Sequence, residues 1–220
     1  MKKRKILYTG LDPSHCKCDG EIIHIPLIKI EPVLISDPNI QKSISQFNEY
    51  THVIITSKSV IPILGSFLTS FGFSINDWKK KLTIAVGQVT GHHLRQIGIE
   101  PEIIAQEETA EGIVKELNKL SLKNSCFFWP HSAQSRTVLS NYFEKRKIHY
   151  NACNLYHTQT AISSPLPDIT IYDEIIFTSP STIKAFLEIF GSLPQGVVLT
   201  SIGPVTKAYL ENINSLLSSY

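Results

Sequence analysis

The stretch THVIITSKS at residues 51–59 decides the fold, because the chain nearly repeats it as YDEIIFTSPS at residues 172–181. In both copies a short apolar run typical of a buried strand ends in Thr-Ser, where a helical pattern begins. A second pair of matching segments follows, AVGQVT at residues 85–90 and SIGPVT at residues 201–206. The two copies of each motif lie at nearly the same separation along the chain. The sequence therefore predicts two similar α/β lobes.

Outward from these motifs, short β-rich runs alternate with helical patterns, an order that favours parallel sheets. Ser179 is expected to cap a helix that has Pro180 at its first position, and Gly98 is expected to end another in a left-handed conformation. The expected strands cover 5–8, 52–55, 82–86, 126–128, 174–177 and 197–199, and the expected helices cover about 59–70, 88–97, 109–120, 134–146, 181–190 and 205–216.

The second lobe has too few residues of its own for a covered parallel sheet. The N-terminal segment from Lys5 to Tyr8 can supply its missing strand. The expected organisation is therefore a discontinuous lobe and an inserted one, joined by two extended crossings that pair as a short ribbon. The predicted ranges are 1–30 with 161–220 for the discontinuous lobe, 36–153 for the inserted lobe, and 29–35 and 154–160 for the linkers.

Composition narrows the class of protein. The chain has 220 residues, of which 42% are hydrophobic and 18% are charged, so a packed core is expected rather than disorder. Lys and Arg total 21 against 19 acidic residues, a balance that gives no reason to expect nucleic-acid binding. No apolar run is long enough to span a membrane, and the apolar stretch after the basic start is too short for an export signal. A soluble cytoplasmic protein is expected.

Four cysteines, Cys16, Cys18, Cys126 and Cys153, lack paired CxxC spacing, which favours reduced thiols over a disulfide framework. His15 and His24 lie near Cys16 and Cys18, but the spacing of these four residues matches no zinc module, so no metal site is expected.

The repeated motifs are candidate anion-binding sites. Each lies where a parallel strand gives way to a helix, and backbone N–H groups there lack intrahelical partners while the helix dipole favours negative charge. The simpler alternative is that these Ser, Thr and Gly residues only cap helices. The four candidate turns are Thr56-Ser57-Lys58-Ser59, Gly87-Gln88-Val89-Thr90, Thr178-Ser179-Pro180-Ser181 and Gly203-Pro204-Val205-Thr206.

The pair TSxS and (V/I)GxxT, present twice in a chain of this length, resembles the uroporphyrinogen-III synthase family. The resemblance runs from Pro26 onward and includes the segments 26–32 and 154–158. It implies two flavodoxin-like lobes with parallel sheets, joined by a two-stranded linker, with substrate bound in the cleft. It also implies a lyase of haem biosynthesis that closes hydroxymethylbilane to uroporphyrinogen III, with inversion of the last ring and loss of water. A monomer without metal or organic cofactor is implied, with transient contact with the preceding pathway enzyme.

Site residues carried over from the resemblance include Tyr156, whose phenol would donate a proton or hydrogen bond to the leaving hydroxyl. Its structural alternative is an aromatic wedge between the lobes. Lys58 and Arg136 would meet substrate carboxylates, although a solvated lysine and a surface ion pair account for them equally well. The remaining residues would bind carboxylates through hydroxyl or N–H groups: Thr56, Ser57, Gly87, Thr90, Ser179, Ser181, Gly203 and Thr206.

One position departs from the family, which commonly has Thr-Arg after its first strand where this chain has Thr9-Gly10. The helix expected next is reduced to the segment 12–20. A non-catalytic two-lobed binding or sensor protein is the alternative from another class. A nucleotide-dependent transferase is not favoured, since neither GxxxxGK[ST] nor GxGxxG occurs. His92, His93 and His131 lack a carboxylate or thiol partner at an interpretable spacing, so they are left out of the site.

Overall fold

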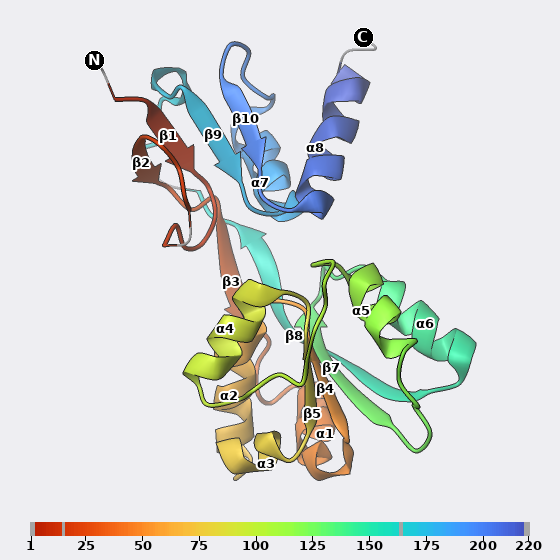
Figure 1. Cartoon of the computed structure of the whole chain (residues 1–220). Coiled ribbons are helices and arrows are strands. Elements are labelled where there is room, and N and C mark those ends of the chain that lie inside the picture. Colours follow the sequence, from red (N-terminus) through yellow and green to blue (C-terminus); the bar gives the residue numbers. More distant parts are fainter. Residues whose placement is uncertain (1–2, 15, 163–164, 218–220) are drawn as a thin grey trace. The chain divides into compact units, whose positions relative to one another are not determined.

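The structure, a computed structural model, describes residues 3–14, 16–162 and 165–217 (Figure 1). The chain divides into two compact units. Unit 1 comprises Met1–Lys29 and Thr158–Tyr220, and unit 2 comprises Ile30–His157. Both units consist of a sheet with parallel strand pairing and covering helices, so the predicted α/β class with parallel sheets is confirmed.

The sheet of unit 1 has the strand order β10-β9-β1-β2, and every pairing in it is parallel. The first strand of the chain therefore lies in the middle of a sheet whose other half comes from the last third of the sequence. The strands are β1 (Lys5–Tyr8), β2 (Glu21–His24), β9 (Glu174–Phe177) and β10 (Val198–Ser201).

The two faces of this sheet are covered differently. Alternate residues of β1 and β9 face opposite sides, as the two-residue period of a strand requires. Leu7 and Phe177 pack in one apolar cluster with residues of helices α7 (Pro180–Phe190) and α8 (Pro204–Leu217). On the other face, a smaller cluster of Ile6, Tyr8 and Ile176 packs against Cys16, Cys18 and Ile22.

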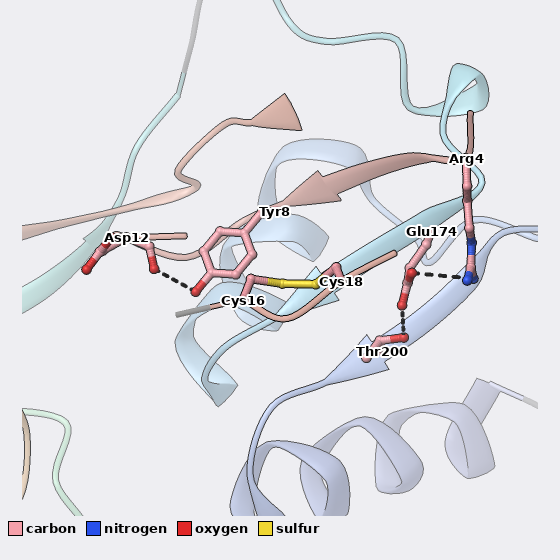
Figure 2. The surroundings of a disulfide bond; sticks show 7 residues. All are labelled: Arg4, Tyr8, Asp12, Cys16, Cys18, Glu174 and Thr200. Atoms are coloured by element: carbon pink, nitrogen blue, oxygen red, sulfur yellow. Dashed lines mark hydrogen bonds and ion pairs between the residues drawn. A yellow bond between two sulfur atoms is a disulfide. The ribbon is translucent and has the colours of Figure 1, made fainter. Parts of the chain in front are cut away.

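Cys16 and Cys18 form a disulfide in the loop between β1 and β2 (Figure 2), so the expectation of reduced thiols was wrong for this pair. Their Cα atoms are 5.6 Å apart, within the range that a disulfide spans. CxxC spacing gives no indication of this bond, because the loop joins two cysteines that are only two residues apart. Cys126 and Cys153 are free thiols.

The sheet of unit 2 has the strand order β3-β8-β7-β4-β5-β6. Pairing is parallel from β8 through to β6. The strands are β3 (Ile28–Pro32), β4 (His52–Ile55), β5 (Leu82–Ala85), β6 (Ile103–Ile104), β7 (Cys126–Ser132) and β8 (His149–Thr160); β3 and β8 run on into unit 1.

Helices cover both faces of the unit 2 sheet. Val53 and Phe128 face a cluster that includes Trp78 and residues of four helices, while Ile54 and Phe127 face a second cluster under two helices. The first group comprises α1 (Pro38–Ser45), α2 (Val60–Ser70), α3 (Ile75–Lys79) and α4 (Gln88–Gln96), and the second comprises α5 (Ala110–Leu117) and α6 (Val138–Arg146).

Most expected elements occur within one or two residues of their predicted ends. Gly98 has a φ of +83°, as expected for a left-handed helix stop, and Ser179 caps α7 with Pro180 at its start. The helix expected from residue 134 begins only at Val138, because Ser132 and Gln134 form a hydrogen-bonded turn first. The patterns missed the short elements α1, α3, β2 and β6.

No helix in the described part of the chain is both long and apolar enough to cross a membrane. The same residues hold no group of three or more His, Cys, Asp or Glu side chains that could bind a metal ion. His15, considered with Cys16 and Cys18 as a ligand set, lies outside the described residues.

Candidate functional site

The turn after β4 brings the first set of predicted residues to the carboxyl edge of the unit 2 sheet. Thr56 accepts a long hydrogen bond from the Trp129 indole N–H (3.4 Å), and Ser57 Oγ accepts one from the backbone N–H of Ser59 (3.2 Å). Lys58 is half-buried in the same turn. Ser59, the residue before α2, makes no side-chain capping bond to that helix. The serine hydroxyls of this turn are therefore not used to begin the helix.

The hydroxyls of Ser57 and Ser59 lie beside the phenol of Tyr156, which is a residue of β8. Tyr156 is only 4% exposed. Burial raises the pKa of its phenol above 10, and side-chain hydrogen bonds with Ser57, Ser132 and Ser59 oppose that rise. The phenol is therefore protonated at neutral pH, as a proton or hydrogen-bond donor must be, and it lies among the hydroxyls of Ser57, Ser59 and Ser132.

Ser132 reaches Tyr156 through an irregularity in the sheet. The register of β7 with β8 shifts between His131 and Ser132, so that Ser132 pairs with Tyr156. Such bulges re-aim side chains and are frequent beside active sites. His131 stacks on Trp129 with ring centroids 4.1 Å apart, and burial lowers the pKa of its imidazole. This histidine is therefore neutral at pH 7.

The second motif of unit 2 forms the N-terminus of α4. Gly87 is extended, and a Cβ there would lie 2.5 Å from the Glu108 carboxyl carbon. The absence of a side chain lets Glu108 accept a hydrogen bond from the Gln88 backbone N–H (2.8 Å). A carboxylate of the protein thus occupies this helix N-terminus, so the turn itself accepts an anion. Thr90, in the first turn of α4, is 5% exposed.

Arg136 follows β7 and forms a two-pronged ion pair with Glu111, with N–O distances of 2.5 and 2.7 Å. Both side chains are 47% exposed. The pairing raises the pKa of the guanidinium and lowers that of the Glu111 carboxyl. Arg136 has the geometry to bind a carboxylate, and a substrate carboxylate would have to displace Glu111 to use it.

In unit 1 the corresponding Thr-Ser turn is a closed capping box. Ser179 Oγ accepts from the Thr182 N–H (3.3 Å), while Thr182 Oγ1 accepts from the N–H groups of Ser179 (3.3 Å) and Thr178 (3.2 Å). Ser179 is thereby committed to starting α7. Ser181, half-buried in the first turn of α7, lies outside this box.

The second motif of unit 1 is open. Gly203 has a φ of +82°, is exposed, and has nothing within 4 Å of the position a Cβ would take. Thr206, in the first turn of α8, is 3% exposed, matching the burial of Thr90 in α4. Among the described residues, neither of these two threonine hydroxyls has a hydrogen-bond partner. Both are therefore available to a ligand.

Gly10, at the carboxyl end of β1, has a packing reason for lacking a side chain. A Cβ there would lie 2.5 Å from two side-chain atoms of Thr178, and the Gly10 carbonyl accepts a hydrogen bond from His24 Nε2 at 2.8 Å. The arginine common in the resembled family would not fit beside Thr178 in this arrangement.

The structure thus brings Ser57 and Tyr156 together, includes Ser59 of the same candidate turn, and adds three residues that the sequence did not indicate, Ser132, Glu108 and Glu111. Ser59 and Ser132 bond to the phenol, and Glu108 and Glu111 occupy two candidate anion sites. Ser132 could have been found from its place at the end of a strand. The two glutamates carry no local signal, because each comes from a segment distant in sequence from its partner.

Comparison with known proteins gives a consistent result. The family model described as uroporphyrinogen-III synthase HemD matches residues 15–215. A porphyrin biosynthesis protein HemD of Ruminiclostridium josui is 22% identical over 205 residues, which cover 89% of this chain and 40% of that protein. A crystal structure of mutant uroporphyrinogen III synthase from Thermus thermophilus has a TM-score of 0.64 at 15% identity, covering 96% of this chain and 89% of that one. The uroporphyrinogen-III synthetase of Helicobacter pylori 26695 has a TM-score of 0.64 at 16% identity, with the same coverage.

Proposed function

This chain belongs to the uroporphyrinogen-III synthase family, a lyase family of haem biosynthesis, and from that premise we propose how its residues carry the reaction. The substrate is hydroxymethylbilane, a linear tetrapyrrole with acetate and propionate groups on its rings. The product is uroporphyrinogen III, formed with inversion of ring D and loss of water. The observation that carries the proposal is the buried, protonated Tyr156 phenol beside the hydroxyls of Ser57, Ser59 and Ser132.

Tyr156 assists the departure of the terminal hydroxyl. The C–O bond of the hydroxymethyl group breaks as the phenol gives its proton to the leaving oxygen, so water departs and a protonated azafulvene remains beside the phenolate. The α-carbon of ring D that carries the link to ring C attacks the methylene of this cation and gives a spiro intermediate. The link to ring C then breaks and re-forms at the other α-carbon of ring D, so that the last ring is turned over. The proton lost when the final ring recovers its aromaticity restores the phenol. A positioned proton donor of this kind contributes about 10²–10⁴-fold to a rate.

The carboxylates of the substrate are bound by hydroxyls and helix N-termini in both units. Thr90 and Thr206 offer buried hydroxyls, and Ser181 and Gly203 offer groups at the starts of α7 and α8. Glu108 on the α4 N-terminus is the chain's own example of the same contact. Thr56, Lys58, Gly87, Arg136 and Ser179 complete the proposed binding set.

The enzyme acts without a metal or organic cofactor, since ring closure needs only positioning and one proton transfer. We propose a cytoplasmic monomer that binds neither nucleic acid nor membrane and receives its substrate through transient contact with the preceding pathway enzyme. The non-catalytic sensor alternative is not favoured, because the family model spans nearly the whole chain.

The test supplies enzymatically generated hydroxymethylbilane to the purified protein and separates the oxidised products into type I and type III isomers. Wild type should give excess type III, and Tyr156→Phe should lower type III formation about 10²–10⁴-fold. Tyr150→Phe is the matched control, because Tyr150 lies on the same strand and its hydroxyl donates to Glu144 (3.0 Å), away from the serines. Type I alone from wild type would refute the synthase assignment. Full activity of Tyr156→Phe would refute only the proton-donor role.

A further inference from the structure

A pocket of about 540 Å³ lies at the amino-terminal edge of the unit 2 sheet, where β7 and β8 begin. Tyr156 lies seven residues further along β8 than His149, which lines the pocket. At roughly 3.3 Å per strand residue, the pocket is about 20 Å from the phenol and on the opposite edge of the sheet. It belongs to none of the motifs described above.

Basic side chains converge on this pocket. Its lining includes Lys123, Arg146, Lys147 and His149, and no acidic residue. Arg146 is held in place by its hydrogen bond to Asn118 and by its position over the Tyr142 ring, 5.4 Å from the ring centroid. Within the described part of the chain, Lys123 and Lys147 have no ion-pair partner. These cations therefore present uncompensated positive charge to the pocket.

One part of the lining is apolar, and Asn124, Ser125 and Cys126 complete it. Leu120, Leu122 and Ile148 are half-buried and pack against the core cluster beneath α5 and α6. A pocket that combines an apolar wall with a cationic rim suits an organic anion better than a fully hydrated inorganic one, because only the former has apolar surface to bury.

The backbone conformation of two lining residues also points to a binding role for this pocket. Asn124 (φ 60°) and Lys147 (φ 54°) are the two non-glycine residues with positive φ in the described chain, and both line this pocket. Lys147 is the left-handed residue that ends α6, a position where glycine is the usual and less strained choice. Lys145, also in the last turn of α6, already supplies a cation to the helix C-terminus. Asparagine accepts this conformation readily, whereas Lys147 is held against its preference, and such residues often mark binding sites.

We propose that this pocket is a second binding site, for a small organic polycarboxylate with an apolar centre. Its carboxylates would pair with Lys123, Arg146 and Lys147, while its ring or carbon frame would rest on Leu122 and Ile148. The site is independent of the proposed ring-closing activity, because it uses none of the residues assigned to that activity.

Isothermal titration with benzene-1,2,4,5-tetracarboxylate at low salt tests the site. Wild type should bind one molecule, and added salt should weaken the binding because the contacts are ionic. Lys147→Gly should weaken binding about fivefold and Lys123→Ala/Lys147→Gly at least tenfold. Lys147→Gly should also leave the thermal midpoint unchanged or raised, since glycine relieves the positive φ. A purely structural role for Lys147 would predict no change in affinity.

Lys145→Ala is the matched control, since Lys145 lies in the same helix turn but does not line the pocket. This variant should bind the tetracarboxylate as tightly as wild type. Equal weakening by Lys145→Ala would overturn the site in favour of diffuse charge attraction. Binding as tight for inorganic pyrophosphate would overturn the apolar contribution. Loss of binding in Thr90→Val but not in the lysine variants would place the probe at the carboxyl edge of the sheet and overturn the proposal. Failure to form type III product would leave the titration interpretable, because binding is measured directly.

Discussion

Unit 2 covers both faces of its sheet with helices, whereas unit 1 covers one face with α7 and α8 and the other with the loop that carries Cys16 and Cys18. The minor cluster of unit 1 contains three buried residues, Ile6, Tyr8 and Ile176. A short loop buries little apolar surface, and the Cys16–Cys18 bond restricts the conformations open to that loop. The disulfide therefore lies on the face of the unit 1 sheet that is covered by a loop and not by helices.

The repeated turns differ in the same way. In unit 1, the Ser179 hydroxyl accepts a hydrogen bond within the capping box of α7. In unit 2, α2 has no side-chain cap, and Ser57 and Ser59 bond to Tyr156. The two copies share a backbone turn and differ in what their hydroxyls do. A repeated motif therefore identifies the same strand-to-helix turn in the two units. The residues packed around each copy decide what its side chains do.

The largest contrast is expected between the serines of the two turns. Ser57→Ala/Ser59→Ala removes two hydrogen bonds that orient the phenol, each worth about 0.5–1.5 kcal/mol, so type III formation should fall roughly 10- to 100-fold. The unfolding midpoint should change less, because Ser132 still bonds to the phenol. Ser179→Ala should lose about 1 kcal/mol of stability through the α7 cap and should lower type III formation less than the double variant does. The isomer assay and denaturant unfolding measure these effects. The comparison would fail if Ser179→Ala lowered type III formation more than the double variant and the double variant lost more stability than Ser179→Ala.

Reduction of the Cys16–Cys18 bond should destabilise unit 1 selectively, by roughly 1–2 kcal/mol for so short a loop. Both tryptophans, Trp78 and Trp129, lie in unit 2, so tryptophan emission reports that unit alone. Hydrogen exchange of unit 1 peptides should accelerate after reduction while the emission transition stays in place. Cys153→Ser provides a control for general thiol effects, and unchanged exchange in unit 1 would show that the loop needs no disulfide.

The two motif glycines should respond differently to alanine. Gly203→Ala forces a side chain into φ +82° and should cost about 1 kcal/mol, although space for it is open. Gly87→Ala requires no positive φ, but it displaces the exposed Glu108 carboxylate from the Gln88 N–H and should cost less, about 0.5 kcal/mol. Thermal unfolding measures both changes. Equal costs would mean that backbone conformation does not distinguish the two turns.

The smallest expected effect is alkaline destabilisation of unit 2. Burial raises the pKa values of Tyr50 and Tyr156, so both stay protonated in the folded state at pH values where the unfolded chain ionises. Because the unfolded state then binds fewer protons, stability falls as pH rises above about 10, by about 0.8 kcal/mol for Tyr50 at pH 10.5, and Tyr156 adds to the fall. Denaturant midpoints between pH 8 and pH 10.5 measure this slope. Tyr156→Phe should make it shallower, and an unchanged slope would mean that the phenol ionises freely.

The sequence by itself determined the parallel α/β class, the family resemblance and the places where strands meet helices. These features follow from short-range rules: β-rich runs bounded by turn residues, Ser-Pro at a helix start, and glycine where φ is positive. The stretch 51–59 and its copy at 172–181 carry the strand-to-helix signal, so no long-range contact was needed to find the repeat.

Only the tertiary structure decided which side chains act together. Ser132 reaches Tyr156 because β7 and β8 are neighbours with a shifted register, Glu111 reaches Arg136 across 25 residues, and Glu108 reaches the α4 N-terminus across 20. The basic pocket likewise joins the loop before β7 to the end of α6. Such contacts depend on strand order and packing, which bring together segments that are distant in sequence. The local sequence of one segment does not indicate which other segment will lie beside it.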